Sequence, residues 1–430
     1  MKRRSFLKSL GAASTLGFLK PGAALAVGGA TARTASLTPE EVASDESYWR
    51  DVQNAFSVSR SLIDLNNGFT CPSPRVVTDS VIDYIWQQEE SPSYVIARLL
   101  PPRIETVRAA LARLFGCDPE EIAIVRNTSE AMEILLLGLD LKAGDEVVTT
   151  TQDYGRMRTT LDQRRRREGI EIKYITIPVP AKTDAEMIEG FRRSIGAKTR
   201  MVLMSHQINL TGQILPVKAV CEIAAERGVP VMVDGAHSFA QFEFQRDDLG
   251  CDYFGTSLHK WLLAPKGTGM LYVRRDKIKG LWPMMAAPEK MDQDIRKFEE
   301  IGTHSLAPYL AIGEAIAFHH SIGGKRKEAR LRYLKDYWAK KLMTLPNVRL
   351  HTSLDPKMSC AIGNVEMVGI APRALSDYLW DEHHIIVAPI EHEEFQGIRV
   401  TPNVYTTLDE LDYFCEVFEG ISKNGLPKSA

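Results

Sequence analysis

The central part of the chain alternates short apolar runs with amphipathic stretches. Unalternated runs such as Val231-Met232-Val233 are typical of strands that are buried on both faces. This alternation predicts βαβ units around a mostly parallel α/β sheet, with Gly267–Val273 as a seventh, edge-type strand. The other predicted strands are Ile122–Val125, Glu146–Thr150, Ile172–Ile177, Met201–Met204, Val229–Val233 and Tyr253–Thr256, and helical patterns between them include Ser129–Leu137, Met157–Glu168 and Val217–Arg227.

The alternation stops near residues 283–298, where a long helical region follows. We therefore predict a large α/β domain over residues 62–298 and a smaller α+β domain over 299–430. Residues 27–61 are predicted to be a linker, Val27–Ser36, followed by an N-terminal helix. In the second domain the expected elements are helices within Leu306–Leu345, broken at Gly323-Gly324, strands at Val348–His351, Cys360–Met367 and Ile385–Val387, and helices at Pro372–Asp381 and Leu408–Ile421.

The first 26 residues carry five basic residues and no acidic one. Arg3-Arg4 precedes a weakly apolar run that ends in Ala24-Leu25-Ala26, a pattern that resembles a twin-arginine export signal cleaved after Ala26. Lys20 and Pro21 interrupt this run, which is also too short for a stable membrane span. We expect use of the twin-arginine export machinery and a periplasmic location, with a basic amphipathic helix as the alternative.

The whole chain is close to neutral, with 53 basic and 55 acidic residues among 430. This balance gives no overall field to attract nucleic acid, so recognition is expected to be local and directed at a small molecule. Without the signal the balance becomes 53 − 5 = 48 basic against 55 acidic residues. The six cysteines show no CxxC or zinc spacing, which favours buried thiols over disulfides or a metal site.

Polar residues follow five of the predicted strands, at the sheet edge where α/β proteins bind ligands. Thr128-Ser129 opens a helix suited to a phosphate, although Ser and Thr are also ordinary caps. Asp234 ends a buried strand and needs a cation or donors, such as a protonated ring nitrogen or the N–H groups of a turn. Lys260 lies in an apolar setting that favours a neutral, Schiff-base-forming amine, unless it reaches solvent. One ligand, pyridoxal phosphate, would satisfy all three.

Two segments also resemble a known family. Asp234-Gly235-Ala236-His237 and Ser257-Leu258-His259-Lys260-Trp261-Leu262-Leu263-Ala264-Pro265-Lys266-Gly267 resemble class V aminotransferases of the fold-type I pyridoxal-phosphate enzymes, and especially isopenicillin N epimerase-like proteins. The resemblance extends from about Leu62 to the C-terminal helix. It implies that Lys260 binds the cofactor covalently and transfers protons, and that Asp234 pairs with the pyridine nitrogen.

The same resemblance implies roles for further residues. Tyr154 would stack on the cofactor ring, and Arg399 and Asn67 would bind the substrate, with the Arg399 guanidinium holding its carboxylate. Thr303 would complete the phosphate site of a second subunit, which implies a homodimer with shared active sites. The remaining cofactor-binding residues would be His237 and Asn209 at the phenolic oxygen and Thr128, Ser129, Ser257 and His259 at the phosphate. Structural roles in packing, capping or ion pairs are the alternative for each.

The cofactor alone does not select a reaction. The first hypothesis is epimerase-like or aminotransferase chemistry at the α-carbon of an amino acid or amino-carboxylate. A carbon–sulfur lyase or desulfurase is the alternative, although residues 384–399 lack the cysteine that a desulfurase needs and only Cys71 offers one near the site. Cys71 is alternatively a second-face acid in epimerisation. The alternative outside the enzymes is a non-catalytic exported binding protein of the same fold.

Three charged segments are discounted as functional sites. His383-His384 and Glu391–Glu394 lack the spacing of a metal site and are expected in solvated loops, so no metal is predicted. Arg164–Arg167 is expected to form a solvated helix face.

Overall fold

A computed structural model gives the fold, and the structure describes residues 21–427. The large domain is built on a seven-stranded sheet of order β2-β8-β7-β6-β5-β3-β4. The strands from β4 to β7 run parallel, and β8 is antiparallel to both of its neighbours. The strands are β2 (Ile122–Val125), β3 (Glu146–Thr150), β4 (Glu171–Ile175), β5 (Thr199–Ser205), β6 (Val231–Asp234), β7 (Tyr253–Ser257) and β8 (Gly269–Val273).

This sheet confirms the predicted α/β class and mostly parallel seven-stranded arrangement. One detail is wrong, because β8 lies between β2 and β7 and is buried along its whole length, so it is not an edge strand. Successive residues of β6 explain the unalternated runs: Val231 and Val233 join the core on one face of the sheet, and Met232 joins the core on the other. Both faces are therefore apolar.

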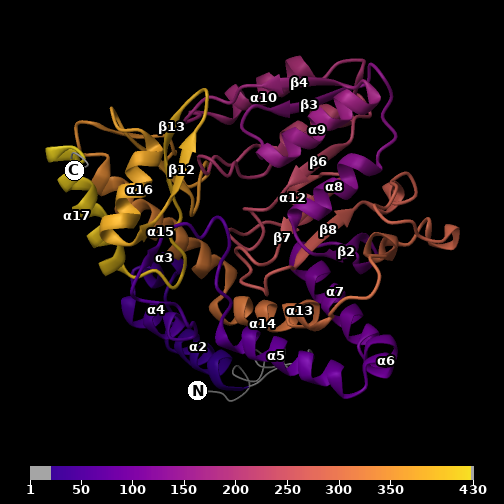
Figure 1. The fold of residues 1–430 in the computed structure, drawn as a ribbon, viewed down its shortest axis with the longest axis horizontal. Coiled ribbons are helices and arrows are strands. Elements are labelled where there is room, and N and C mark those ends of the chain that lie inside the picture. The colour runs from indigo at the N-terminus through magenta and orange to yellow at the C-terminus, as the bar shows by residue number, and fades with distance from the viewer. Residues whose placement is uncertain (1–20, 428–430) are drawn as a thin grey trace.

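Helices cover both faces of the sheet and extend to one side of it (Figure 1). The helices begin where the spacing of apolar residues along the sequence changes from that of a strand to that of a helix. Helix α8, for example, contacts both β7 and β8. The helices of the large domain are α5 (Arg75–Glu90), α6 (Pro92–Tyr94), α7 (Pro101–Phe115), α8 (Thr128–Gly138), α9 (Gly155–Glu168), α10 (Asp184–Ser194), α11 (Val217–Ala225) and α12 (Arg246–Leu249), with a π-helix at Val95–Leu99 and 3-10 turns at Pro119–Glu121, Arg275–Lys277, Glu289–Met291 and Ile295–Glu299.

The second domain packs helices against a four-stranded sheet of order β12-β13-β10-β9. The expected strands are present, and the hairpin β12–β13 was missing from the sequence prediction. A separate pair joins β1 (Ile63–Asp64) to β11 in parallel, so a segment that precedes the large sheet pairs with the second domain. The helices α13 (Ala307–Leu310) and α14 (Ile312–Ile322), predicted for this domain, instead contact α5 and α7 and join the core of the large domain. The elements of the second domain are α15 (Gly324–Leu342), β9 (Val348–Leu350), β10 (Gly363–Met367), α16 (Pro372–His383), β11 (Ile385–Ile386), β12 (Ala388–Glu391), β13 (Gln396–Val400) and α17 (Leu408–Asn424).

The N-terminal segment differs from its prediction. The expected linker at Val27–Ser36 is wrong for most of its length, because helix α2 (Pro21–Arg33) continues past Ala26, the predicted cleavage site. Val27 and Ala30 are fully buried, and α2 contacts α14, so small apolar residues that resemble a linker in sequence form a packed helix face. Two helices follow, α3 (Pro39–Ala43) and α4 (Glu46–Gln53). The twin-arginine pair lies outside the described residues.

No helix within residues 21–427 has the length and apolar character to cross a membrane.

Candidate functional site

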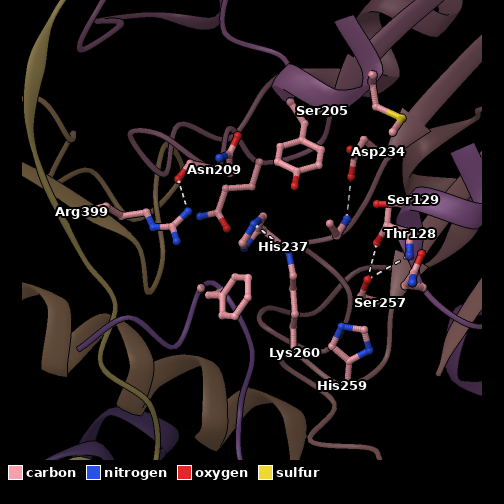
Figure 2. Close-up of a pocket in the computed structure, with 17 residues that line it drawn as sticks. Thr128, Ser129, Ser205, Asn209, Asp234, His237, Ser257, His259, Lys260 and Arg399 are labelled. Atoms are coloured by element: carbon pink, nitrogen blue, oxygen red, sulfur yellow. Dashed lines mark hydrogen bonds between the residues drawn. The ribbon is translucent and has the colours of Figure 1, made fainter. Parts of the chain in front are cut away.

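A cavity of about 260 Å³ opens at the carboxyl ends of the central strands. Figure 2 shows Arg399 at one end, Thr128 and Ser129 at the other, and Lys260 between them. Two predicted residues, Thr303 and Asn67, do not line it. The predicted residues that the structure brings together are Thr128, Ser129, Tyr154, Asn209, Asp234, His237, Ser257, His259, Lys260 and Arg399.

Lys260 extends into the cavity from the loop after β7. Burial lowers the pKa of its amine to about 8, against the opposing effect of the Asp234 carboxylate. The amine nitrogen lies 3.1 Å from Nε2 of His237. Trp261 donates its indole N–H to Nδ1 of His237 at 3.5 Å. Because an indole only donates, Nδ1 accepts and the proton of the neutral imidazole is assigned to Nε2, which then faces the lone pair of a neutral Lys260.

Asp234 ends β6 at the floor of the cavity. Its carboxylate accepts the Ala236 N–H at 3.0 Å, the one hydrogen bond that residues 21–427 give it. Burial raises its pKa to about 6, although this hydrogen bond and the Lys260 charge act in the opposite direction. An undersupplied buried carboxylate fits a protonated ring nitrogen, which would supply both the missing donor and positive charge.

The N-terminus of α8 lies at the end of the cavity away from Arg399 (Figure 2). Asn127 caps this helix by accepting the Glu130 N–H at 2.8 Å, so Thr128 is its first helical residue and not its cap. Ser257 accepts the Thr128 N–H at 2.9 Å, and the two hydroxyls lie 2.7 Å apart. Hydroxyls at a positive helix end form a suitable phosphate site.

Close packing holds that helix end in place. A Cβ atom on Gly269 would lie 2.7 Å from the backbone of Asn127, so only glycine lets the helix approach β8 this closely. His259, from the lysine loop, directs Nδ1 to the Thr268 carbonyl oxygen at 3.1 Å and lines the cavity. The packing of α8 against the sheet therefore fixes the position of the candidate phosphate site, which does not depend on a mobile side chain.

Arg399 projects into the cavity from β13 of the second domain (Figure 2). It is 7% exposed and donates to the Asn209 carbonyl oxygen at 3.1 Å and to Oδ1 of Asn66 at 2.8 Å. Its Nε has no partner, and no acidic residue of the described chain forms a salt bridge with it. Burial lowers the pKa of the guanidinium to about 10. A buried cation without a counterion fits the carboxylate of a ligand.

Tyr154 lies on the loop between β3 and α9, which hydrogen bonds fix from below. Asp153 accepts from the Thr150 N–H at 2.8 Å and from both the N–H and the hydroxyl of Ser205 at 2.7 Å. Asp153 thus joins the end of β3 to the end of β5. Although 43% of Tyr154 is exposed, its backbone is anchored.

The second domain contacts the same loop through the β12–β13 hairpin. Glu394 accepts from the Thr151 hydroxyl at 2.5 Å and from the Gln152 amide at 2.7 Å. His392 Nε2 lies 3.1 Å from the Thr151 carbonyl oxygen. The hairpin that carries Arg399 is therefore tied to the loop that carries Tyr154.

Three sequence predictions do not match this cavity. The Asn67 side chain is fully buried elsewhere, donating to Thr401 O at 2.8 Å and accepting from the Tyr405 hydroxyl at 2.5 Å, so it has no free group for a substrate. The Cys71 thiol is also fully buried, donates to the Asn67 carbonyl oxygen at 3.2 Å and has a pKa raised to about 11 by burial. Because the thiol is buried and does not line the cavity, the structure gives no support to its suggested roles as a nucleophile or second-face acid. Thr303 is exposed and away from the cavity of its own chain.

Several lining residues were not identified from sequence. Ser205 ends β5, Gln207 lies in the loop that follows it, and Phe69 comes from the loop before Cys71. Phe69 is 71% exposed, which is unusual for an aromatic residue in an otherwise buried site. Lys327, on α15, is fully buried and donates to the Trp261 carbonyl oxygen, next to Lys260. No local pattern distinguishes Lys327 from the solvated lysines around it.

The charged segments that were discounted as functional sites form no metal site and make contacts within the fold. No group of three or more His, Cys, Asp or Glu residues within residues 21–427 is arranged to hold a metal ion. The Arg164–Arg167 prediction is wrong for its first member, because Arg164 is buried and donates to the Leu139 carbonyl oxygen at 3.0 Å while pairing with Glu168.

The comparisons with known proteins give relatives of two activities. The chain is 28% identical to isopenicillin N epimerase of Streptomyces clavuligerus over 87% of this chain and 98% of the relative. It is 29% identical to the protein of the same name from Amycolatopsis lactamdurans, over 87% and 99%. A cysteine desulfurase of Haloferax volcanii is 26% identical over 67% of this chain and 71% of the relative.

Solved structures share the fold. An apo cysteine desulfurase from Thermococcus onnurineus NA1 superimposes with a TM-score of 0.77 at 22% identity, covering 88% of this chain and 98% of that one. A cystine C–S lyase variant, with glycine covalently linked to its pyridoxal-phosphate cofactor, gives a TM-score of 0.76 at 22% identity over 85% and 98%.

The cofactor follows from the family and the cavity together. A buried lysine of lowered pKa, a buried carboxylate short of donors and a hydroxyl-lined helix end match the aldehyde, ring nitrogen and phosphate of pyridoxal 5'-phosphate. The model of the aminotransferase class-V family matches residues 65–412, and the chain therefore belongs to this family of pyridoxal-phosphate-dependent proteins.

Proposed function

We propose that this protein is an epimerase that inverts the α-carbon of an amino acid or a related amino-carboxylate. The observation that carries the proposal is the cavity itself. It combines a Lys260 amine of lowered pKa with a buried Arg399 that lacks a counterion, both lining one space large enough for a small molecule. The arrangement suits a proton-transfer base and a carboxylate anchor.

Each residue has a task in this reaction. The cofactor, when bound, supplies an electron sink for the α-carbon. Arg399 orients the substrate by its carboxylate, and Lys260 accepts the α-proton as a neutral amine. Asp234 keeps the ring nitrogen protonated, and the hydroxyls of Thr128 and Ser257 fix the phosphate end. The substrate is fixed at its carboxylate and the cofactor at its phosphate, with the Lys260 amine between them as the base. The α-carbon is then the atom that reacts.

The cysteines distinguish this proposal from desulfuration. All six lie within the described residues; five are buried, the sixth, Cys117, is partly buried, and none lines the cavity. The Cys360 and Cys71 thiols have pKa values raised by burial, to about 12 and about 11. A desulfurase nucleophile needs an accessible thiolate, which these cysteines do not provide.

The experiment is incubation of the holoenzyme in deuterated water. Isopenicillin N and single enantiomers of the amino acids serve as probes, and proton NMR with chiral chromatography follows the α-carbon. We expect the epimer to appear with deuterium at that position. Formation of keto acid or sulfide without any epimer would refute the proposal.

A carbon–sulfur lyase is the second candidate, because the fold is similar to that of a cystine C–S lyase and relatives include cysteine desulfurases. Elimination requires the same base and carboxylate anchor, and no cysteine is needed on the protein when the sulfur leaves with its own fragment. Release of sulfide or persulfide from cystine or cysteine in the same incubations would favour it.

We also propose that the protein is a homodimer in which Thr303 reaches the phosphate site of the second subunit. Thr303 is exposed, and α5 presents Ile82, Ile85 and Trp86 to the surface at 48%, 44% and 69% exposure. Such an apolar face suits contact with another copy. Light scattering that gives the mass of one chain would contradict this assembly.

Export by the twin-arginine machinery to the periplasm is the remaining proposal, and Arg3-Arg4 supports it. Replacing both arginines by lysine should retain the protein in the cytoplasm, as cell fractionation would show. If the variant and the unsubstituted protein were divided between cytoplasm and periplasm in the same proportion, export by this route would be refuted.

A further inference from the structure

Inversion at carbon needs a proton acceptor on one face and a proton donor on the other. Lys260 supplies one of these groups. We propose that Tyr154 supplies the other, so that its phenol is a catalytic acid–base group facing Lys260 across the substrate. This inference rests on the proposed epimerase function and deepens it.

The sheet order places the two residues on opposite sides of Asp234. Asp234 ends β6, Lys260 follows β7 on one side of it, and Tyr154 follows β3, which lies beyond β5 on the other side. Both Lys260 and Tyr154 line the cavity. A cofactor held at Asp234 by its ring nitrogen would therefore have Lys260 and Tyr154 to either side of it.

The surroundings of the Tyr154 hydroxyl suit proton donation. No residue within the described chain forms a hydrogen bond with it, and the guanidinium of Arg399 lies within electrostatic reach of it. Because 43% of Tyr154 is exposed, water at the cavity mouth can restore the proton.

The loop holds Tyr154 firmly enough for this task. Asp153 binds the ends of β3 and β5 directly beside it, and Glu394 binds the two residues before Asp153 from the second domain. A catalytic side chain needs this kind of fixed backbone to stay within reach of the reacting atom.

Other titratable groups of the cavity are less suited. His237 contacts Lys260 and so lies on the same side, and burial holds its pKa well below the usual value. His259 directs Nδ1 to a backbone carbonyl beside the candidate phosphate site, and burial lowers its pKa to about 4. Cys71 does not line the cavity.

The step is balanced in atoms and charge. The α-C–H bond breaks with its proton passing to the neutral Nζ of Lys260, which becomes an ammonium group. The new C–H bond forms on the opposite face with the proton of the Tyr154 hydroxyl, which becomes a phenolate. Water then takes one proton from the ammonium and returns one to the phenolate, and the reverse reaction uses the same groups with their roles exchanged.

The test uses Tyr154→Phe holoenzyme and both epimers of isopenicillin N, or of an amino acid that the unsubstituted enzyme turns over, in deuterated water. Because Lys260 remains, the epimer whose α-C–H bond faces Lys260 should still exchange its α-proton within about threefold of the unsubstituted rate but without inverting, whereas the other epimer should lose exchange as well. Inversion should fall at least ~100-fold, as expected for loss of a general acid. Affinity for pyridoxal phosphate, measured by fluorescence titration, should stay within twofold, because the stacking ring is retained.

Tyr174→Phe is the matched control, since Tyr174 lies on β4, away from the cavity lining, and should invert the probe normally. Inversion by Tyr154→Phe at the unsubstituted rate would overturn this inference alone. Loss of exchange in both epimers, together with an equal loss of inversion and cofactor affinity, would overturn it too, because the role would then be structural. Neither exchange nor inversion by the unsubstituted enzyme would overturn the proposed function and this inference with it.

Discussion

Attachment of pyridoxal phosphate to the apo protein should depend on pH through the Lys260 amine. Only the neutral amine attacks an aldehyde. Burial lowers the Lys260 pKa from 10.5 to about 8. At pH 7.5 a lysine of pKa 10.5 is roughly 0.1% neutral, whereas one of pKa about 8 is roughly one-quarter neutral, so the reactive fraction rises by about 200-fold. We expect the attachment rate to increase with pH and to level off just above pH 8.

Stopped-flow absorbance of cofactor binding across pH 6 to 10 measures this profile. Asp234→Asn removes the carboxylate that raises the Lys260 pKa, so the midpoint should move to lower pH even if attachment becomes weaker. Asp162→Asn, an exposed change on α9, should leave the midpoint in place. A midpoint near pH 10 in the unsubstituted protein would refute the argument that burial prepares this lysine.

Three further predictions follow from the same structure. Arg399→Lys should lower kcat/KM by about 30-fold, corresponding to about 2 kcal/mol of lost bidentate binding, for substrates with a carboxylate; a similar loss for amines without one would contradict the assignment. Gly269→Ala should weaken cofactor binding at least ~10-fold in a fluorescence titration, because its Cβ would lie 2.7 Å from the Asn127 backbone, while Gly280→Ala, which has room, should not. The Lys327 pKa is lowered to about 7 by burial. The unfolded chain therefore binds more protons between about pH 7 and 10.5, so stability increases with pH there, and Lys327→Met should flatten this rise by on the order of 5 kcal/mol in urea unfolding; parallel profiles would contradict it.

The sheet could be predicted because its determinants are local. Each strand combines a short apolar run with a polar residue at its end, as at Val233-Asp234, and parallel topology then brings those ends to one edge. Ten of the proposed site residues consequently lie together. The edge position given to β8 was wrong because strand order depends on pairing between segments far apart in the chain.

Side-chain burial was harder to predict. Asn67 and Cys71 lie in a polar, turn-rich segment, yet contacts with Thr401, Tyr405 and Asn403 remove both from the cavity. These partners follow more than 300 positions later, so no local pattern contains the information. The same holds for α2, whose small residues are buried only because α14 packs against them.

The central claim is that Lys260 carries the cofactor in an active PLP enzyme. Reduction of the holoenzyme with borohydride, followed by proteolysis and mass spectrometry, tests it most directly. We predict that the reduced cofactor is attached to Lys260, that Lys266 and Lys327 remain unmodified, and that Lys260→Ala takes up no covalent cofactor. A label on another lysine, or none on the protein after incubation with pyridoxal phosphate, would contradict the account.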